Sequence, residues 1–142
     1  MGQIRLDEMF CRSASYRQEI LPPPKRLETD SLNIKISVKT WEREEGRVDV
    51  ELGVQIDPDL EHGQPYYVDV YLFARFHFHD LPEGLTRDEF TQRNAAAIMF
   101  PYAREVVWSL TMRGKYGCLW LPTVNVIGLL DQARERDAVE AG

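Results

Sequence analysis

This sequence of 142 residues has only two cysteines, no long apolar run and no excess of positive charge. Cys11 and Cys118 form no CxxC pair, so we expect two reduced thiols rather than a disulfide framework. No apolar run is long enough to span a membrane, and no basic-then-apolar leader is present. The net charge of −6 disfavours nucleic-acid partners, which need concentrated positive charge. These absences indicate a cytoplasmic protein without direct membrane insertion.

The motifs of common enzyme classes are also missing. No glycine-rich phosphate loop is present, because the nine glycines fall at expected turns. Ser109 and the two cysteines have no nucleophile elbow and no partnered base. The carboxylates fall mostly on strand positions expected to face water, which gives no acid–base pair. We therefore expect a protein that is not an enzyme and needs no cofactor.

His77 and His79 have metal-binding spacing, because residues two apart share one face of a strand. A zinc site would need further ligands, which His62, Asp80 or Cys118 could supply only if the fold brings them close. Paired histidines near a strand end are more often partly buried polar residues, so we predict no metal site. A small ligand- or metal-binding protein that uses this pair is the alternative from a different functional class.

Alternating apolar residues predict four strands. Residues 1–20 alternate loosely, which indicates an irregular or bulged first strand. Residues 31–41 and 47–57 alternate cleanly, so they are expected to form a hairpin with one face toward the core and one toward water. The fourth run, 66–79, is apolar at every even position but mixes aromatic and charged residues at the odd positions. Either another surface covers this second face or it binds a partner.

The longest expected helix spans residues 94–114. Six apolar residues share one side of it, suited to cover a sheet: Met99, Tyr102, Ala103, Val106, Val107 and Leu110. The opposite side is polar, with Arg104 and Thr111, but it also carries Trp108. A large indole on a polar side favours contact with a second surface.

Proline and glycine set the expected helix boundaries. Pro101 would either kink the long helix or begin a new one, and Gly114 predicts its end. The loop 115–123 is unusually apolar, so we expect it to pack against another surface. A final helix at 126–138 would end in a frayed tail, 139–142. The whole chain is expected to be one domain in which a helix covers a sheet.

Three short runs are distinctive: IMFPYARE at 98–105, Arg113-Gly114, and LPTVN at 121–125 followed by Leu129-Leu130. In this order they resemble the SecB family of bacterial export chaperones. They are similar to the family's helix with its FPYARE run, to its Arg-Gly stop, and to its crossover loop with a proline before Val-Asn. The resemblance covers about a quarter of the chain at high specificity, and the order of elements upstream agrees with it.

The resemblance implies an α+β fold, with a four-stranded antiparallel sheet and both a long helix and a C-terminal helix packed on one face. Family members assemble as homotetramers, each a dimer of dimers. They are chaperones, not enzymes: without ATP they hold unfolded polypeptide or preprotein clients in apolar grooves and pass them to the SecA translocase motor.

The resemblance also assigns residues to these roles. The client groove would be lined by Tyr67, Tyr71, Phe73, Tyr116, Leu119, Trp120 and Leu121. The oligomer interface would involve Tyr102, Arg104, Trp108 and Thr111.

The chain departs from the family where SecA would bind. Asp69 matches an acidic SecA-contact residue on the last strand. The first strand, however, offers Ser13 and Arg17 where the family has acidic residues. The runner-up is therefore a solitary SecB-like chaperone that protects an antitoxin or another specific client. A structural subunit without clients, in which the aromatic residues form only an interface, is the third reading.

Overall fold

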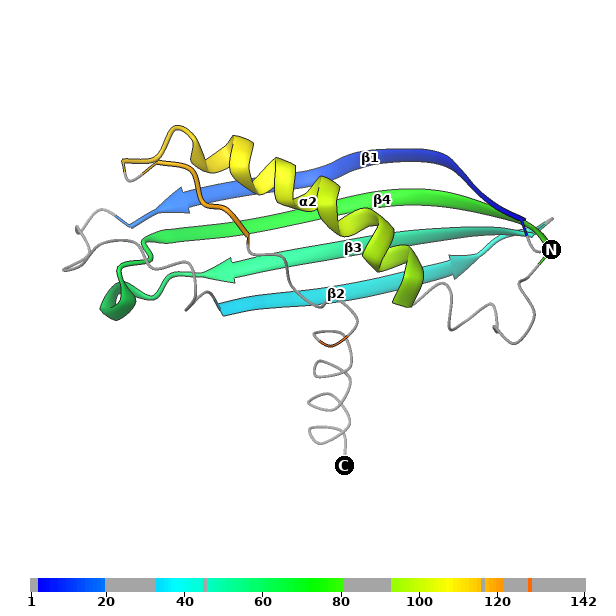
Figure 1. The fold of residues 1–142 in the computed structure, drawn as a ribbon, viewed down its shortest axis with the longest axis horizontal. Coiled ribbons are helices and arrows are strands. Elements are labelled where there is room, and N and C mark those ends of the chain that lie inside the picture. Colours follow the sequence, from blue (N-terminus) through cyan, green and yellow to red (C-terminus); the bar gives the residue numbers. More distant parts are fainter. Residues whose placement is uncertain are drawn as a thin grey trace, which may run out of the picture.

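The computed structural model describes residues 3–19, 33–44, 46–80, 93–115, 117–121 and 128. The elements in chain order are the strands β1 (Gln3–Gln18), β2 (Asn33–Glu42) and β3 (Arg47–Asp57), the 3₁₀ helix η2 (Leu60–His62), the strand β4 (Tyr66–Asp80) and the helix α2 (Ala95–Thr111). The strands form one sheet in the order β1-β4-β3-β2, and all neighbours are antiparallel. Helix α2 lies obliquely across one face of this sheet (Figure 1). The predicted four-stranded sheet with a long helix on one face is confirmed, whereas the predicted C-terminal helix lies almost entirely outside the described residues.

The β2–β3 hairpin follows the predicted alternation on its core side. The apolar residues of β3 that face α2 are all buried: Val48, Val50, Leu52, Val54 and Ile56. The hairpin turns at Gly46, whose φ of 76° lies in the left-handed region that glycine adopts without strain. The Gly46 carbonyl accepts a hydrogen bond of 2.9 Å from the amide of Phe78, so the turn is fastened to β4.

Strand β1 is irregular, as its loose alternation predicts. Its register against β4 shifts three times: between Gln3 and Ile4, between Leu6 and Glu8, and between Cys11 and Ser13. Each such shift lets a residue leave the regular alternation of faces. Arg12 lies at the third shift, and its side chain crosses the sheet to reach Glu51 on β3.

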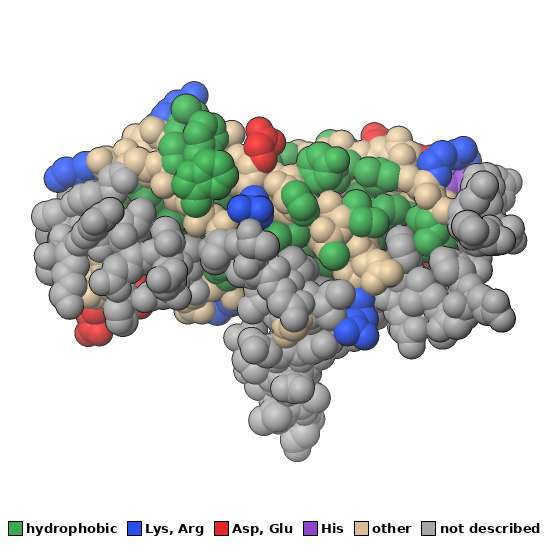
Figure 2. All heavy atoms as spheres, in the orientation of Figure 1, with side chains coloured by type: hydrophobic (Ala, Val, Ile, Leu, Met, Phe, Trp, Pro, Cys, Tyr) green, Lys and Arg blue, Asp and Glu red, His purple; other side chains and the backbone are tan. Residues whose placement is uncertain are grey.

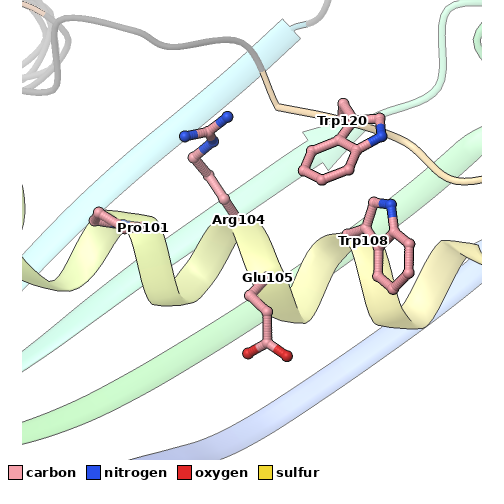
Figure 3. Close-up of a pocket in the computed structure, with 5 residues that line it drawn as sticks. All are labelled: Pro101, Arg104, Glu105, Trp108 and Trp120. Carbon is pink, nitrogen blue, oxygen red and sulfur yellow. The ribbon is translucent and has the colours of Figure 1, made fainter.

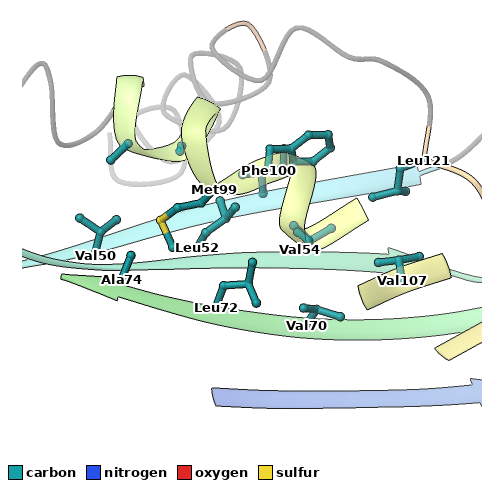
Figure 4. Close-up of a cluster of buried hydrophobic side chains, with 14 of the residues drawn as sticks. Val50, Leu52, Val54, Val70, Leu72, Ala74, Met99, Phe100, Val107 and Leu121 are labelled. Carbon is teal, nitrogen blue, oxygen red and sulfur yellow. The ribbon is translucent and has the colours of Figure 1, made fainter. Parts of the chain in front are cut away.

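The core lies between α2 and the sheet (Figure 4). Seven residues of α2 are buried: Ala95, Ala96, Met99, Phe100, Ala103, Val107 and Thr111. The predicted apolar side is therefore partly wrong, because Tyr102 is exposed and Val106 and Leu110 are only partly buried. The alanines explain the difference. Their small side chains let the helix approach the sheet closely, but they stand out less in the sequence pattern than large apolar side chains.

The helix neither begins nor ends at its proline and glycine. Helix α2 continues through Pro101, which lies on the exposed side, where its missing N–H removes one backbone hydrogen bond. The helix ends at Thr111, before the predicted stop at Gly114. Gly114 serves a different purpose, since a Cβ atom there would collide with the buried ring of Tyr66.

Candidate functional site

The residues predicted to line one groove lie on opposite faces of the sheet. Tyr67, Tyr71 and Phe73 are half-buried at odd positions of β4, on the face away from α2, whereas the even positions of β4 form the core. Trp120 lies on the other face, beside α2 (Figure 3). Tyr116 lies outside the described residues. Within the described part of one chain, these side chains therefore form two separate apolar surfaces.

Three of the predicted contact residues have no exposed surface. Leu119 and Leu121 are fully buried in the core rather than open to a client, and Thr111 is fully buried rather than available to another subunit. Thr111 was expected on the polar side of α2, but its hydroxyl donates a hydrogen bond of 2.9 Å to the carbonyl of Val107. This bond satisfies the hydroxyl inside the helix and removes the cost of burying it.

Hydrogen bonds tether residues 117–121, in the segment after α2, to the rest of the fold. The amide of Leu119 donates to the Thr111 hydroxyl at 2.7 Å. The Arg104 Nε donates to the Leu121 carbonyl at 3.1 Å. Further along, the Tyr66 hydroxyl donates to the Gly117 carbonyl at 2.9 Å. The apolar segment thus packs against its own chain, which supplies the surface that this loop is expected to contact.

These tethers place Trp120 against Trp108 and form what we call the tryptophan pocket. Its lining residues are Pro101, Arg104, Glu105, Trp108 and Trp120. The two indole rings have centroids 5.7 Å apart and planes inclined by 49°. The cavity has a volume of about 230 Å³ and opens on the exposed side of α2 (Figure 3). Trp120 is 56% exposed, an unusual fraction for an indole that already has an aromatic partner.

The pocket belongs to a larger apolar area on this face of the molecule. Large apolar side chains along and just beyond α2 are exposed: Ile98, Tyr102, Met112 and Trp120. In the space-filling view, hydrophobic side chains gather over α2 and the segment that follows it, with a basic and an acidic side chain between them (Figure 2). An apolar area of this kind is typical of a surface that contacts other polypeptides.

The family comparison agrees with this geometry. A family model described as "SecB: Preprotein translocase subunit SecB" matches residues 2–137. The chain belongs to the SecB family. No curated protein matches it.

Two solved structures share the fold. One is the SecB-like chaperone Rv1957 of Mycobacterium tuberculosis in complex with a ChAD peptide from the HigA1 antitoxin, which is 16% identical, with 85% of this chain and 90% of that chain covered and a TM-score of 0.61. The other is a protein of unknown function from Streptococcus agalactiae, which is 11% identical, with 86% and 98% covered and a TM-score of 0.50. At such identities the likeness concerns the fold.

Asp69, the predicted SecA contact of this SecB-family chain, is partly withdrawn into the sheet. Its Oδ1 atom is buried and has no hydrogen-bond partner among the described residues. It borders a small cavity of about 80 Å³ together with Lys35, Ser37, Gln55 and Tyr71. Burial, and then the negative charge of Asp69, raise the pKa of the Tyr71 hydroxyl.

The neighbouring part of β1 carries the predicted departure from the family. Ser13 pairs with Tyr71, and Arg17 pairs with Tyr67. The Arg17 guanidinium lies over the Tyr67 ring, 4.9 Å from its centroid, as a cation–π contact. Arg17 also forms an ion pair with Glu19 at 3.7 Å, so this end of the β1–β4 surface presents a paired cation near Asp69, one oxygen of which is buried.

Two carboxylates on the face of the sheet away from α2 contradict the prediction that this face of the hairpin is exposed to water. Asp49 and Glu51 alternate as polar positions in β3, yet both are buried. Arg43 and Arg75 bind Asp49, and Arg12 binds Glu51. Their arginine partners come from the turn and from distant strands, so the local pattern of β3 gave no signal of this burial.

The structure describes both cysteines but, of the three histidine side chains, only that of His77. Both cysteines are free, as predicted. The Nδ1 atom of His77 lies 3.1 Å from a guanidinium nitrogen of Arg5. The side chains of His79, His62 and Asp80 lie outside the described residues. Among the side chains that are described, no group of three or more histidine, cysteine or acidic residues could hold a metal ion. Likewise, no described helix is long and apolar enough to cross a membrane.

Proposed function

We propose that this SecB-family chain is an ATP-independent holdase chaperone that binds unfolded or preprotein chains and keeps them competent for export. Membership of the family supports the class of function. The observation that carries the proposal is the open tryptophan pocket, whose outer wall, Trp120, is 56% exposed. An active site needs an arrangement of reactive groups, whereas this pocket offers apolar area bordered by one cation and one anion.

The pocket suits clients that share no sequence. Tryptophan gives a large, rigid apolar surface that accepts aromatic and aliphatic side chains alike. Arg104 is partly committed to the Leu121 carbonyl, and in Figure 3 Glu105 points away from the two indoles. The polar groups therefore impose little selection on the side chain that enters, as broad client recognition requires.

One pocket alone would bind weakly. Burial of a single leucine or phenylalanine side chain contributes about 1.5–3 kcal/mol, which is too little to hold a chain against its own collapse. Several pockets on one assembly can engage the same unfolded chain and raise the overall affinity without new contacts. A homotetramer in the cytoplasm, built as a dimer of dimers, is part of the proposal for this reason.

The destination of the client has two candidates. Transfer to SecA is the first, because it follows from the family. The second is a dedicated client, as in Rv1957, which was solved with an antitoxin peptide. Two features favour the second: Arg17 lies over Tyr67 where the family has an acidic residue, and the Oδ1 atom of Asp69 is buried.

The deciding experiment is native mass spectrometry with and without a reduced, chemically unfolded client, in the absence of nucleotide. We expect a tetramer that takes up the client and suppresses its aggregation. The Trp120→Ala variant should lose most of this activity, whereas Ile98→Ala removes an exposed apolar side chain of α2 that does not line the tryptophan pocket and should retain it. Equal suppression by an unrelated acidic protein of the same size, or equal activity of both variants, would refute the pocket as the client site.

A further inference from the structure

The face of the sheet opposite α2 carries a patch in which arginines lie over buried carboxylates. We call it the basic–aromatic patch and define it by Phe10, Arg12, Arg43, Phe73 and Arg75. Its centre is an aromatic pair from neighbouring strands, Phe10 of β1 and Phe73 of β4, with ring centroids 5.0 Å apart. Phe10 is exposed, so the pair forms part of the molecular surface.

Arginines lie beyond the aromatic pair. Arg75 follows Phe73 by two residues in β4 and therefore shares its face. Its Nε and Nη2 atoms bind the two oxygens of Asp49 at 2.8 and 3.2 Å, while the Nε atom of Arg43 binds the same carboxylate at 2.8 Å. Two guanidinium groups thus share one carboxylate, and the charge of Glu8, which also acts on Arg75, offsets the formal excess of one positive charge.

The third arginine completes the patch. Arg12 binds Glu51, the residue of β3 that pairs with Phe73. The carboxylates are hidden below the cations: the side chain of Asp49 is 1% exposed and that of Glu51 is 5% exposed, against 54% for Arg43 and 62% for Arg12. Glu8, which pairs with Arg75 on β1, is an exposed acid at the margin of the patch. A partner that approaches this patch meets guanidinium groups and aromatic rings.

We propose that the basic–aromatic patch is a docking site for an acidic segment of a polypeptide partner that also carries an apolar side chain. The unused guanidinium N–H groups of Arg43 and Arg12 would donate to the partner's carboxylates, and Phe10 with Phe73 would receive its apolar side chain. In an extended segment, side chains of one face recur about every 7 Å, which matches the step from Phe73 to Arg75 along β4. The partner would therefore place an acidic residue two positions from the apolar one.

Charge argues for a short acidic peptide segment rather than a long polyanion. The whole chain has a net charge of −6, which repels nucleic acid at long range. The guanidinium groups are more exposed than the two carboxylates that they bind, so they can attract a short acidic segment within roughly one Debye length, about 8–10 Å at physiological salt. The site is also distinct from the tryptophan pocket, which lies on the opposite face of the sheet. Its existence does not depend on the holdase activity.

The test is the fluorescence anisotropy of two labelled peptides on the full-length protein. One peptide alternates glutamate with phenylalanine, and the other replaces every glutamate with lysine. We expect the acidic peptide to bind at least about ten-fold more tightly, because charge-assisted hydrogen bonds carry the contact, and to weaken as salt rises. Arg43→Gln combined with Phe10→Ala should lower this affinity by about ten-fold or more. Arg43 is chosen because Arg75 still pairs with Asp49 in its absence.

Controls separate this docking site from general electrostatics and from the holdase activity. Arg113→Gln makes the same change of charge at an exposed position after α2 and should leave peptide affinity unchanged. The Arg43→Gln, Phe10→Ala variant should still suppress aggregation of an unfolded client. Equal affinity for the two peptides, equal loss in Arg113→Gln, or equally tight binding of an oligonucleotide of the same charge would each overturn the proposal. Loss of aggregation suppression in the Arg43→Gln, Phe10→Ala variant would show that the patch is part of the client site and not a separate docking site.

Discussion

Trp108 and Trp120 lie with ring centroids 5.7 Å apart, one on helix α2 and the other on the segment that leaves it. Trp108 therefore has an aromatic neighbour within its own chain, although the sequence suggested that a second surface was needed to contact it. The pair leaves one indole half-buried and the other exposed. An intramolecular partner for Trp108 and an exposed Trp120 together create a surface on which other chains can pack.

Substitution of Trp108 tests whether this surface also joins subunits. Trp108→Glu places a charge in the wall of the tryptophan pocket, which would disfavour any apolar interface that covers it. We expect native mass to shift from tetramer toward dimer if a second subunit packs beside the pocket against Trp108 and leaves Trp120 open to clients. Glu105→Gln, a neutral change at the rim of the same pocket, is the matched control and should keep the wild-type mass. An unchanged mass in Trp108→Glu would place the subunit interface elsewhere.

The aromatic residues on the opposite face give a second prediction. Tyr71→Ala with Phe73→Ala removes two half-buried rings from β4 without opening the core, because the core residues of this strand occupy its even positions. We expect weaker binding of the alternating glutamate–phenylalanine peptide, measured by isothermal titration, with unchanged aggregation suppression and an unchanged native mass. Dissociation of the oligomer would instead show that these rings form an interface between subunits.

Gly114 offers a test of the packing that positions the tryptophan pocket. Gly114→Ala forces a methyl group against the fully buried ring of Tyr66, and overpacking of this kind costs about 1–3 kcal/mol. Gly117 is the control: its φ of 83° is left-handed, but a Cβ atom there would meet open space. Gly117→Ala should cost only the backbone strain of an L-residue in the left-handed region, about 1–2 kcal/mol. Urea unfolding compares the two, and a smaller loss at Gly114 would contradict the packing argument.

Asp49 should make stability depend on pH. Hydrogen bonds from Arg75 and then from Arg43 lower the pKa of this buried carboxyl below its ordinary value of 3.8. Its contribution is therefore fully present above the pKa of the unfolded chain, near 4, and is lost as pH falls through the lower folded pKa. Asp49→Asn should reduce the free energy of unfolding by about 1–3 kcal/mol at pH 7.

The same variant identifies the cause of this dependence. The difference between the wild type and Asp49→Asn should shrink in urea unfolding series as the pH is lowered from about 5 toward about 3, because protonation removes the charge in the wild type as well. Glu44→Gln, which neutralises an exposed carboxylate in the adjacent turn, should show little difference at either pH. A constant difference for Asp49→Asn would mean that packing, not charge, holds this site together.

The sequence predicts the sheet well because alternation and burial coincide there. Every even position from Tyr66 to Phe78 is apolar and buried, so strand parity alone identifies the core face of β4. The same parity places Tyr67, Tyr71 and Phe73 away from the core. Because Leu119 and Leu121 flank Trp120 and are buried, the segment that carries Trp120 packs on the core side of the sheet. The separation into two surfaces was thus partly available from the sequence, but the family resemblance led to a single groove.

The buried polar residues could not be predicted from local pattern. Asp49 is hidden because Arg75 reaches it from β4 and Arg43 from the turn, and Glu51 because a register shift in β1 brings Arg12 across the sheet. Such partners are distant in sequence and depend on register, which alternation does not specify. Thr111 is similar, since its hydroxyl accepts a hydrogen bond from the Leu119 amide that exists only once the segment after α2 has folded back.

The Thr111 hydroxyl has a consequence for the thermodynamics of client capture. It joins the last turn of α2 to the amide of Leu119, next to Trp120, so the outer wall of the tryptophan pocket moves only if the end of the helix moves. Ordering the backbone of one residue costs about 1–2 kcal/mol, and here that cost is met when the protein folds. A client therefore pays the conformational entropy of its own ordering but not that of the wall it meets. Capture by a preorganised wall can be fast and broad at once, because the chaperone does not need to reshape itself for each chain.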